Sequence, residues 1–248
     1  MPSAALEGIF RSLRVYYGDA GRHAAMDRLY RQFLKSGDLA FDIGAHVGDR
    51  IASFRRCGAR VIALEPQPLA YRALRLIHGR DSKVDIHAAA CAAEPGTMTL
   101  LVNSANPTVT TASQDFTQAA RGAGGWEGQV WDAEIEVPCF SLDCLIARYG
   151  VPRFIKIDVE GFEADVLAGL SHPLPALSFE FTTIQRGVAD VCIDHLEQLG
   201  NYKFNLALGE SQYLDHNVSC DSAAMRAIIR DLPHEANSGD IYALRTDA

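Results

Sequence analysis

Residues 39–48 (Leu-Ala-Phe-Asp-Ile-Gly-Ala-His-Val-Gly) constrain the fold of this chain more than any other segment. A short apolar run ends in a carboxylate and two glycines, and the residues that follow repeat at helical spacing. A strand, turn and helix of this kind are typical of a nucleotide-cofactor pocket in an α/β sheet. Glycine lets the backbone approach a ligand closely, and the start of the helix offers unpaired N–H groups. The carboxylate favours a ligand with hydroxyls or a positive charge over a pyrophosphate.

The size and charge of the chain fit an ordinary globular domain. Its 248 residues are 48% hydrophobic and 22% charged, which is enough for a sizeable core. The net charge of −8 argues against a nucleic-acid partner, which needs a basic face. No apolar run approaches the roughly 20 residues of a membrane span, and the first residues lack the pattern of a secretory signal. We therefore expect no transmembrane segment and a cytoplasmic location. The six cysteines form no C-x-x-C pair, which favours reduced, buried thiols.

Strand and helix patterns alternate from residue 38 onward, which predicts a parallel sheet. Two helices, interrupted by Gly18 to Gly21, are expected over 3–37. The chain is thus predicted to contain an N-terminal helical cap (1–37) and a Rossmann-like domain (38–248). The cap has two open interpretations, a cover for the pocket or a homodimer contact. The main strands are predicted at 39–43, 60–65, 84–89, 154–158, 177–181, 202–208 and 240–244, with short additional strands at 98–102 and 135–137. Helices are predicted at 48–57, 68–78, 142–149, 161–170, 188–199 and 222–231.

Residues 103–133 differ from this pattern. They contain several Thr and Ser residues, an Asn-Pro pair and a glycine-rich stretch before Trp126. A connection of this length predicts a lid or substrate loop, and a plain flexible insertion is the alternative. Trp126 and Trp131 are able either to stack on an acceptor ring or to anchor the loop.

Acidic residues end the first two predicted strands. Asp42 closes the first and Glu65 the second, close to the ~20-residue spacing of the ribose-binding acid in dinucleotide folds. In a right-handed β-α-β unit both carboxylates reach the same sheet edge, where Glu65 is able to accept both ribose hydroxyls. Two acids repel a pyrophosphate, and the glycines do not follow G-x-G-x-x-G. S-adenosylmethionine, with a sulfonium, an ammonium and no phosphate, therefore fits better than NAD. The structural alternative is that Asp42 caps a helix and Glu65 starts a turn.

The second informative segment covers residues 154–163. Lys156 and Asp158 lie on one face of a strand, near the carboxyl end where open α/β sheets bind ligands. A lysine in a central strand needs a partner, and we expect Glu180 on the next strand to provide it. In the structural alternative this ion pair only shapes the floor of the pocket. Asp158 and Glu160 are candidates for contact with cofactor or acceptor. A metal site built from them and a histidine lacks tight ligand spacing, so no metal is expected.

With both motifs identified, the chain resembles the FkbM family of S-adenosylmethionine-dependent methyltransferases, a family named after a macrolide O-methylating enzyme. The resemblance spans about residues 38–182. It is carried by residues 42–48, Glu65-Pro66, the helix entry at 141–143, and residues 156–163 with 166–169.

The resemblance implies a class I methyltransferase fold, with a seven-stranded mostly parallel sheet, an antiparallel last strand and helices on both faces. It implies that the methionine side of S-adenosylmethionine lies along the first glycine loop, the ribose on Glu65 and the adenine near the end of the third strand. Two departures stand out. The family commonly has Asn where this chain has His46, and residues 88–93 are poor in polar groups. The expected cofactor residues are Asp42, Gly44, Ala45, His46, Gly48, Glu65, Pro66 and Ala89.

The expected reaction is in-line transfer of a methyl group to a hydroxyl of a sugar, glycan, polyketide or similar small molecule. Such a hydroxyl needs a nearby base. Asp158 is the first candidate, with Glu160 and Lys156 as the other expected catalytic residues. Two alternatives stay open, an NAD-dependent oxidoreductase and a non-catalytic cofactor- or partner-binding module on the same fold.

Overall fold

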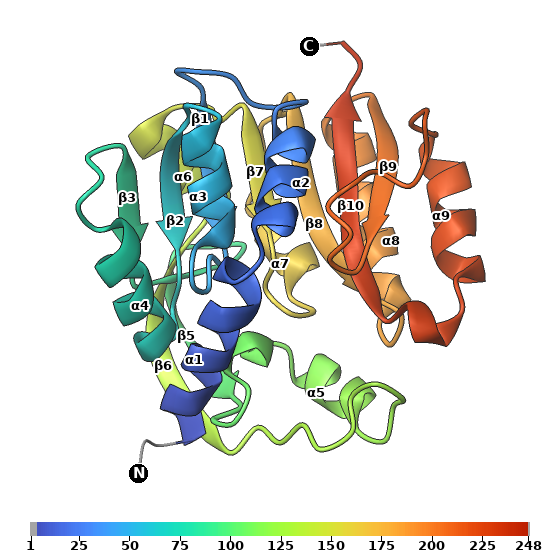
Figure 1. Ribbon diagram of the computed structural model, residues 1–248. Helices are drawn as coiled ribbons and strands as arrows, with labels where there is room; N and C mark the ends of the chain where they lie inside the picture. The colour runs from blue at the N-terminus through green and yellow to red at the C-terminus, as the bar shows by residue number, and fades with distance from the viewer. Residues whose placement is uncertain (1–3, 248) are drawn as a thin grey trace.

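In the computed structural model, which describes residues 4–247, a seven-stranded sheet forms the centre of the molecule (Figure 1). Every strand pair from β3 (Val84–His87) to β8 (Ala176–Thr182) is parallel, whereas β10 (Ser238–Arg245) is antiparallel to both of its neighbours. The expected mostly parallel sheet with an antiparallel last strand is confirmed. In spatial order the strands are β3 (Val84–His87), β2 (Arg60–Leu64), β1 (Leu39–Ile43), β7 (Phe154–Ile157), β8 (Ala176–Thr182), β10 (Ser238–Arg245) and β9 (Tyr202–Leu208).

Helices cover both faces of this sheet, as expected (Figure 1). Their apolar side chains form two large buried clusters, one on each face. The first cluster involves α6 (Leu142–Tyr149), α7 (Glu163–Ala168), α8 (Arg186–Leu199) and α9 (Ser222–Asp231). The second involves α2 (Ala20–Tyr30), α3 (Asp49–Arg56) and α4 (Pro68–His78).

Strand β1 is buried on both sides, which explains its continuous apolar run. Phe41 and Ile43 belong to one cluster and Ala40 to the other, and all three are 0% exposed. The alternating directions of successive side chains produce this division. The strand therefore holds the loop that follows it at a fixed place on the sheet edge.

The helix predicted at 161–170 is shorter than expected, since α7 covers only Glu163–Ala168. Gly161 has a left-handed φ of +85°, and Phe162 has a non-helical ψ of 14°. The backbone after β7 therefore makes a tight turn before α7 begins.

A second, three-stranded sheet lies beside the first and was not predicted as a separate unit. It has the order β4 (Ala90–Cys91), β6 (Ala133–Phe140) and β5 (Gly96–Val102). Strand β6 is longer than the predicted 135–137 because all of β5 pairs with it in antiparallel register. Its alternating exposed and buried residues leave only a short apolar signal in the sequence.

Residues 103–133, between β5 and β6, have a small core of their own. They contain the 3₁₀ turn η1 (Pro107–Val109) and the helix α5 (Gln114–Ala120). Trp126 is 7% exposed, and its ring packs edge to face on that of Phe116, with 5.1 Å between the ring centroids. Trp131 Nε1 donates to the carbonyl of Val109 at 2.8 Å. Both tryptophans therefore anchor the segment, and its function as a lid stays a prediction.

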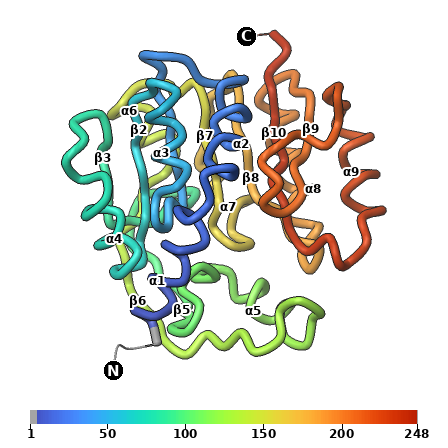
Figure 2. The backbone as a smooth tube through the Cα atoms, viewed as in Figure 1, coloured from blue at the N-terminus to red at the C-terminus, as the bar shows by residue number. Residues whose placement is uncertain are grey.

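The N-terminal helices lie against the rest of the chain (Figure 2). Helix α1 (Ala4–Tyr17) passes beside the 103–133 segment, because Gly8 packs closely on Pro107. Residues 1–3 of the predicted cap fall outside the described residues. Within residues 4–247, no helix has the length and apolar character needed to cross a membrane.

Candidate active site

The glycine loop after β1 forms one wall of a pocket at the carboxyl edge of the sheet. The backbone N–H groups of Gly44 and Ala45 both donate to the carbonyl of Leu64 at 3.0 Å. Gly44 has a φ of +83°, and a Cβ atom there would lie 1.7 Å from the carbonyl oxygen of Asp158. Glycine is therefore required, because it lets the loop after β1 and the loop after β7 touch.

We expect Gly44→Ala to lower the free energy of unfolding by about 2–4 kcal/mol, since it combines a strained φ with a backbone clash. Gly37→Ala is the matched control, because Gly37 has a φ of +91° but nothing within 4 Å of its Cβ position. Urea unfolding of both variants separates the two costs. Equal losses in the two variants would show that the contact with Asp158 is unimportant.

The second glycine of the loop, Gly48, does not line the pocket. It precedes α3 with a φ of +86°, and a Cβ atom there would lie 2.8 Å from the His78 ring. His78 Nε2 lies 2.9 Å from the Gly48 carbonyl and 3.1 Å from the Tyr17 hydroxyl. The geometry gives Gly48 a role in the shape of the loop, without direct contact to the pocket.

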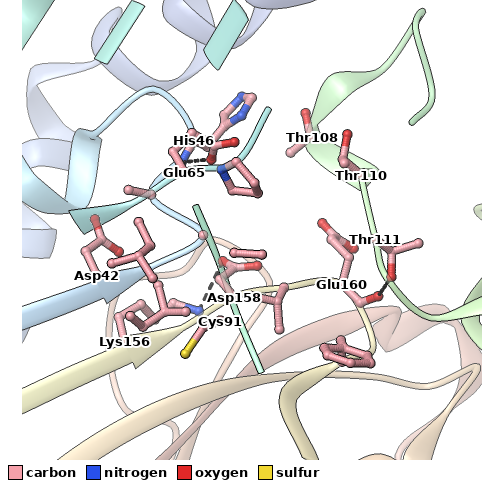
Figure 3. A pocket seen from close by; sticks show the side chains of 18 of the residues that line it. Asp42, His46, Glu65, Cys91, Thr108, Thr110, Thr111, Lys156, Asp158 and Glu160 are labelled. Carbon is pink, nitrogen blue, oxygen red and sulfur yellow. Dashed lines mark hydrogen bonds and ion pairs between the residues drawn. The ribbon is translucent and has the colours of Figure 1, made fainter. Parts of the chain in front are cut away.

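Glu65 lies at the end of β2, beside the glycine loop (Figure 3). One carboxylate oxygen accepts from the His46 backbone N–H and the other from the Gln67 backbone N–H, both at 2.7 Å. Each oxygen has two lone pairs, so these bonds orient the carboxylate and leave acceptors for a ligand. Burial raises the pKa of Glu65 to about 8. The two backbone hydrogen bonds lower this pKa, but their effect is smaller than that of burial.

Three buried polar atoms of residues that line the pocket have no hydrogen-bond partner among residues 4–247: Asp42 Oδ2, His46 Nε2 and Arg50 Nε. Asp42 is 1% exposed, and burial raises its pKa to about 7. Burial lowers the pKa of His46 to about 4, so its ring is neutral at pH 7. The Tyr16 ring packs edge to face on the His46 ring, with 5.9 Å between the ring centroids. The unpartnered atoms of Asp42 and His46 fit a cofactor that carries both hydrogen-bond donors and a positive charge.

The prediction that Glu180 is the ion-pair partner of Lys156 was wrong. Its ammonium pairs with Asp240 at 2.6 Å and with Asp158 at 3.1 Å, and no ion pair joins it to Glu180. The last strand inserts beside β8 and places Asp240 opposite Glu180. Ser178, which is level with Lys156 on β8, is small enough for the lysine to reach past it. An antiparallel strand distant in sequence thus supplies the counter-charge.

The other predicted catalytic residues follow β7 (Figure 3). Asp158 N–H donates to the carbonyl of Ile43 at 2.9 Å, which ties this turn to β1. Glu160 adopts a left-handed φ of +56°, and its carbonyl oxygen accepts from Thr111 Oγ1 at 2.6 Å. The pKa values of Glu160 and Glu180 are both raised well above the ordinary range. Burial is the larger cause, and repulsion from Asp158 is the second.

The pocket unites most of the predicted site residues in about 930 Å³ of space that includes some open solvent. It is acidic, which fits a cationic cofactor. The carboxylates that line it are Asp42, Asp49, Glu65, Asp158, Glu160 and Glu210, against the cations Arg50 and Lys156. The predicted residues Gly44, Ala45, His46, Pro66 and Ala89 also line it.

Several lining residues were not predicted. Tyr16 comes from α1, which supports the interpretation of the N-terminal helices as a cover. Thr108, Thr110 and Thr111 come from the predicted lid. Glu210 follows β9 and pairs with Arg22 at 2.7 Å. Helical periodicity and composition identify such segments, but they do not show which single residue turns towards a distant loop.

The raised pKa values predict that stability falls as the pH rises. Asp42 and Glu65 shift from 3.8 and 4.5 to about 7 and about 8, so between these limits the folded state keeps protons that the unfolded state has lost. The stabilisation is complete below about pH 4 and is lost towards pH 8. Thermal unfolding of the ligand-free protein between about pH 4 and pH 8 tests the predicted fall in stability. Glu65→Gln, which does not titrate, should flatten the curve, and an unchanged slope in this variant would contradict the assignment.

The strand order and the pocket after β1 define the fold of the class I methyltransferases. A family model described as the methyltransferase FkbM domain matches residues 42–222. This chain therefore belongs to the FkbM methyltransferase family, which confirms the predicted family and its cofactor, S-adenosylmethionine.

Two curated relatives have named activities. The hexuronic acid methyltransferase AglP of Haloferax volcanii is 27% identical over 165 residues, covering 65% of this chain and 62% of the relative. The 31-O-demethyl-FK506 methyltransferase FkbM of Streptomyces tacrolimicus is 30% identical over 174 residues, covering 60% of this chain and 66% of the relative. The chain thus spans a little under two thirds of each relative's length.

Among solved structures, a TehB-like methyltransferase from Corynebacterium glutamicum overlaps 96% of this chain and 94% of its own. The identity is 10% and the TM-score 0.47. A similarity of this size says nothing about activity.

Proposed function

We propose that this protein transfers the methyl group of S-adenosylmethionine to a hydroxyl oxygen of a sugar, glycan, polyketide or similar small molecule. The observation that carries the proposal is the position of Asp158. Its carboxylate is 33% exposed at the pocket, level with the glycine loop and held by Lys156 at 3.1 Å. A carboxylate placed there is able to accept the proton of an acceptor hydroxyl as the oxygen attacks the methyl carbon.

Different residues that line the pocket have separate roles in this methyl transfer. Gly44, Ala45 and Glu65 hold and orient the cofactor, whose sulfonium supplies the reactive methyl group. Lys156 holds the Asp158 carboxylate in place through their ion pair at 3.1 Å. Thr108 and Thr110 line the opposite side of the pocket and offer hydroxyls to a polar acceptor (Figure 3). The names of the two relatives, a hexuronic acid methyltransferase and a 31-O-demethyl-FK506 methyltransferase, support an oxygen-rich acceptor.

Incubation with S-adenosylmethionine and a panel of uronic acids, neutral sugars and polyketide alcohols tests this function. We expect S-adenosylhomocysteine to form with at least one class, together with a product that gains one methylene in mass and is stable to base as an ether. A product methylated on nitrogen or carbon, or as a base-labile ester, would contradict transfer to a hydroxyl.

A further inference from the structure

Three carboxylates converge where β7 ends. Asp158, Glu160 and Glu180 each place one oxygen within 4.8 Å of the oxygens of the other two. Because Lys156 is level with Ser178 in the parallel register of β7 and β8, Glu180 lies level with Asp158. Glu160 joins them through the tight turn that follows.

When Glu160 and Glu180 are ionised, the surrounding side chains neutralise only part of the negative charge of the cluster. The Lys156 ammonium forms ion pairs with Asp158 at 3.1 Å and with Asp240 at 2.6 Å. Within the described part of the chain, neither Glu160 nor Glu180 has a cationic side chain at ion-pair distance. Like charges at such short range repel strongly in a buried site. A further positive charge would therefore stabilise the cluster.

The same carboxylates also lack hydrogen-bond donors. Glu180 Oε2 is buried and has no partner in the span from residue 4 to residue 247. Glu160 is only 8% exposed and lines the pocket, and the Thr111 hydroxyl binds its carbonyl oxygen instead of its carboxylate. Buried carboxylate oxygens without donors are costly, and a bound cation would satisfy them.

The spacing suits a hard divalent cation. Metal–oxygen distances of about 2.0–2.6 Å place two ligand oxygens at most about 4–5 Å apart. The three oxygens meet that limit, and small side-chain rotations would bring them to the shorter spacing of a smaller ion. Ligand sets made only of oxygen favour Mg²⁺, Mn²⁺ or Ca²⁺ over Zn²⁺.

We propose that Asp158, Glu160 and Glu180 form a binding site for a divalent cation at the acceptor side of the pocket. The role of the cation rests on the proposed function. It binds the acceptor hydroxyl and makes it more acidic, and a neighbouring carboxylate takes the proton. The oxygen then bonds to the methyl carbon while the sulfur–carbon bond breaks and leaves its electron pair on sulfur. Acceptors with a second oxygen beside the reacting hydroxyl would chelate the cation and bind best.

Mn²⁺ binding tests the site directly, without cofactor or acceptor. The protein is treated with EDTA and dialysed, and free Mn²⁺ is followed by electron paramagnetic resonance during a titration. We expect one Mn²⁺ per chain, and an affinity at least about tenfold weaker in Glu180→Gln, which removes one ligand charge but keeps the side-chain volume. Glu136→Gln, which removes the same charge from an exposed position on β6, should bind as the wild type does.

Two results would overturn the proposal: no saturable Mn²⁺ binding by the folded wild type up to millimolar concentration, or equal binding by the wild type and Glu180→Gln. If Glu180→Gln does not fold, Glu160→Gln replaces it with the same two outcomes. A protein that binds S-adenosylmethionine but not Mn²⁺ would refute the cation site alone. A protein that binds Mn²⁺ but not S-adenosylmethionine would refute the proposed function alone.

Discussion

Glu65→Ala should weaken S-adenosylmethionine binding by about 10²-fold or more. A hydrogen bond to a charged group is worth about 1.5–3 kcal/mol, and this carboxylate is placed to accept two from a ribose. Alanine removes both bonds and leaves the cofactor hydroxyls without acceptors. Isothermal titration calorimetry measures the loss.

Loss of loop structure needs a separate control, because the Glu65 carboxylate also accepts from the backbone N–H groups of His46 and Gln67. Glu65→Gln keeps one amide oxygen for the loop, so it should fold normally and still bind the cofactor more weakly than the wild type. Glu136→Ala, at an exposed position, should not change the affinity. An affinity for Glu65→Ala equal to that of the wild type would remove Glu65 from the cofactor site.

Asp158→Asn should lower the turnover number by about 10²–10⁴, the usual contribution of a general base. Asparagine has nearly the same shape and keeps an oxygen that accepts from Lys156, whose charge is still paired with Asp240 at 2.6 Å. The affinity for S-adenosylmethionine should therefore change little, so that the effect falls on catalysis. Single-turnover kinetics at saturating cofactor measure this step.

The matched control is Asp115→Asn, which removes an exposed carboxylate in the first turn of α5. It should react at the wild-type rate. If Asp158→Asn retains full turnover, the base lies elsewhere, and Glu160→Gln becomes the next variant to measure. If Asp158→Asn loses cofactor affinity and turnover together, Asp158 binds the cofactor and is not specific to the chemical step.

The sequence was sufficient to predict the centre of this fold, because the relevant signals are local. The buried strand β1, the loop at Gly44 and the acid at Glu65 lie within a single β-α-β unit, whose handedness fixes how its parts meet. The pocket brings Asp42, Glu65 and Asp158 together as expected. Their roles in binding and catalysis stay predictions until the variants are measured.

Long-range pairings were outside the reach of sequence reasoning. Lys156 was assigned to Glu180 because the two strands are consecutive, whereas the insertion of β10 beside β8 brings Asp240 to the lysine. Tyr16 reaches the pocket only because α1 folds back over the glycine loop. The three-carboxylate cluster was missed for the same reason, since Glu180 comes from a neighbouring strand and forms no short ligand motif with Asp158.

Titration of S-adenosylmethionine and, separately, of NAD into the wild-type protein tests the central claim most directly. An acidic pocket with unpartnered buried polar atoms on Asp42, His46 and Arg50 and no phosphate-binding glycine motif predicts saturable binding of one S-adenosylmethionine per chain and no binding of NAD. A folded sample that binds NAD and fails to bind S-adenosylmethionine would contradict the account of this pocket.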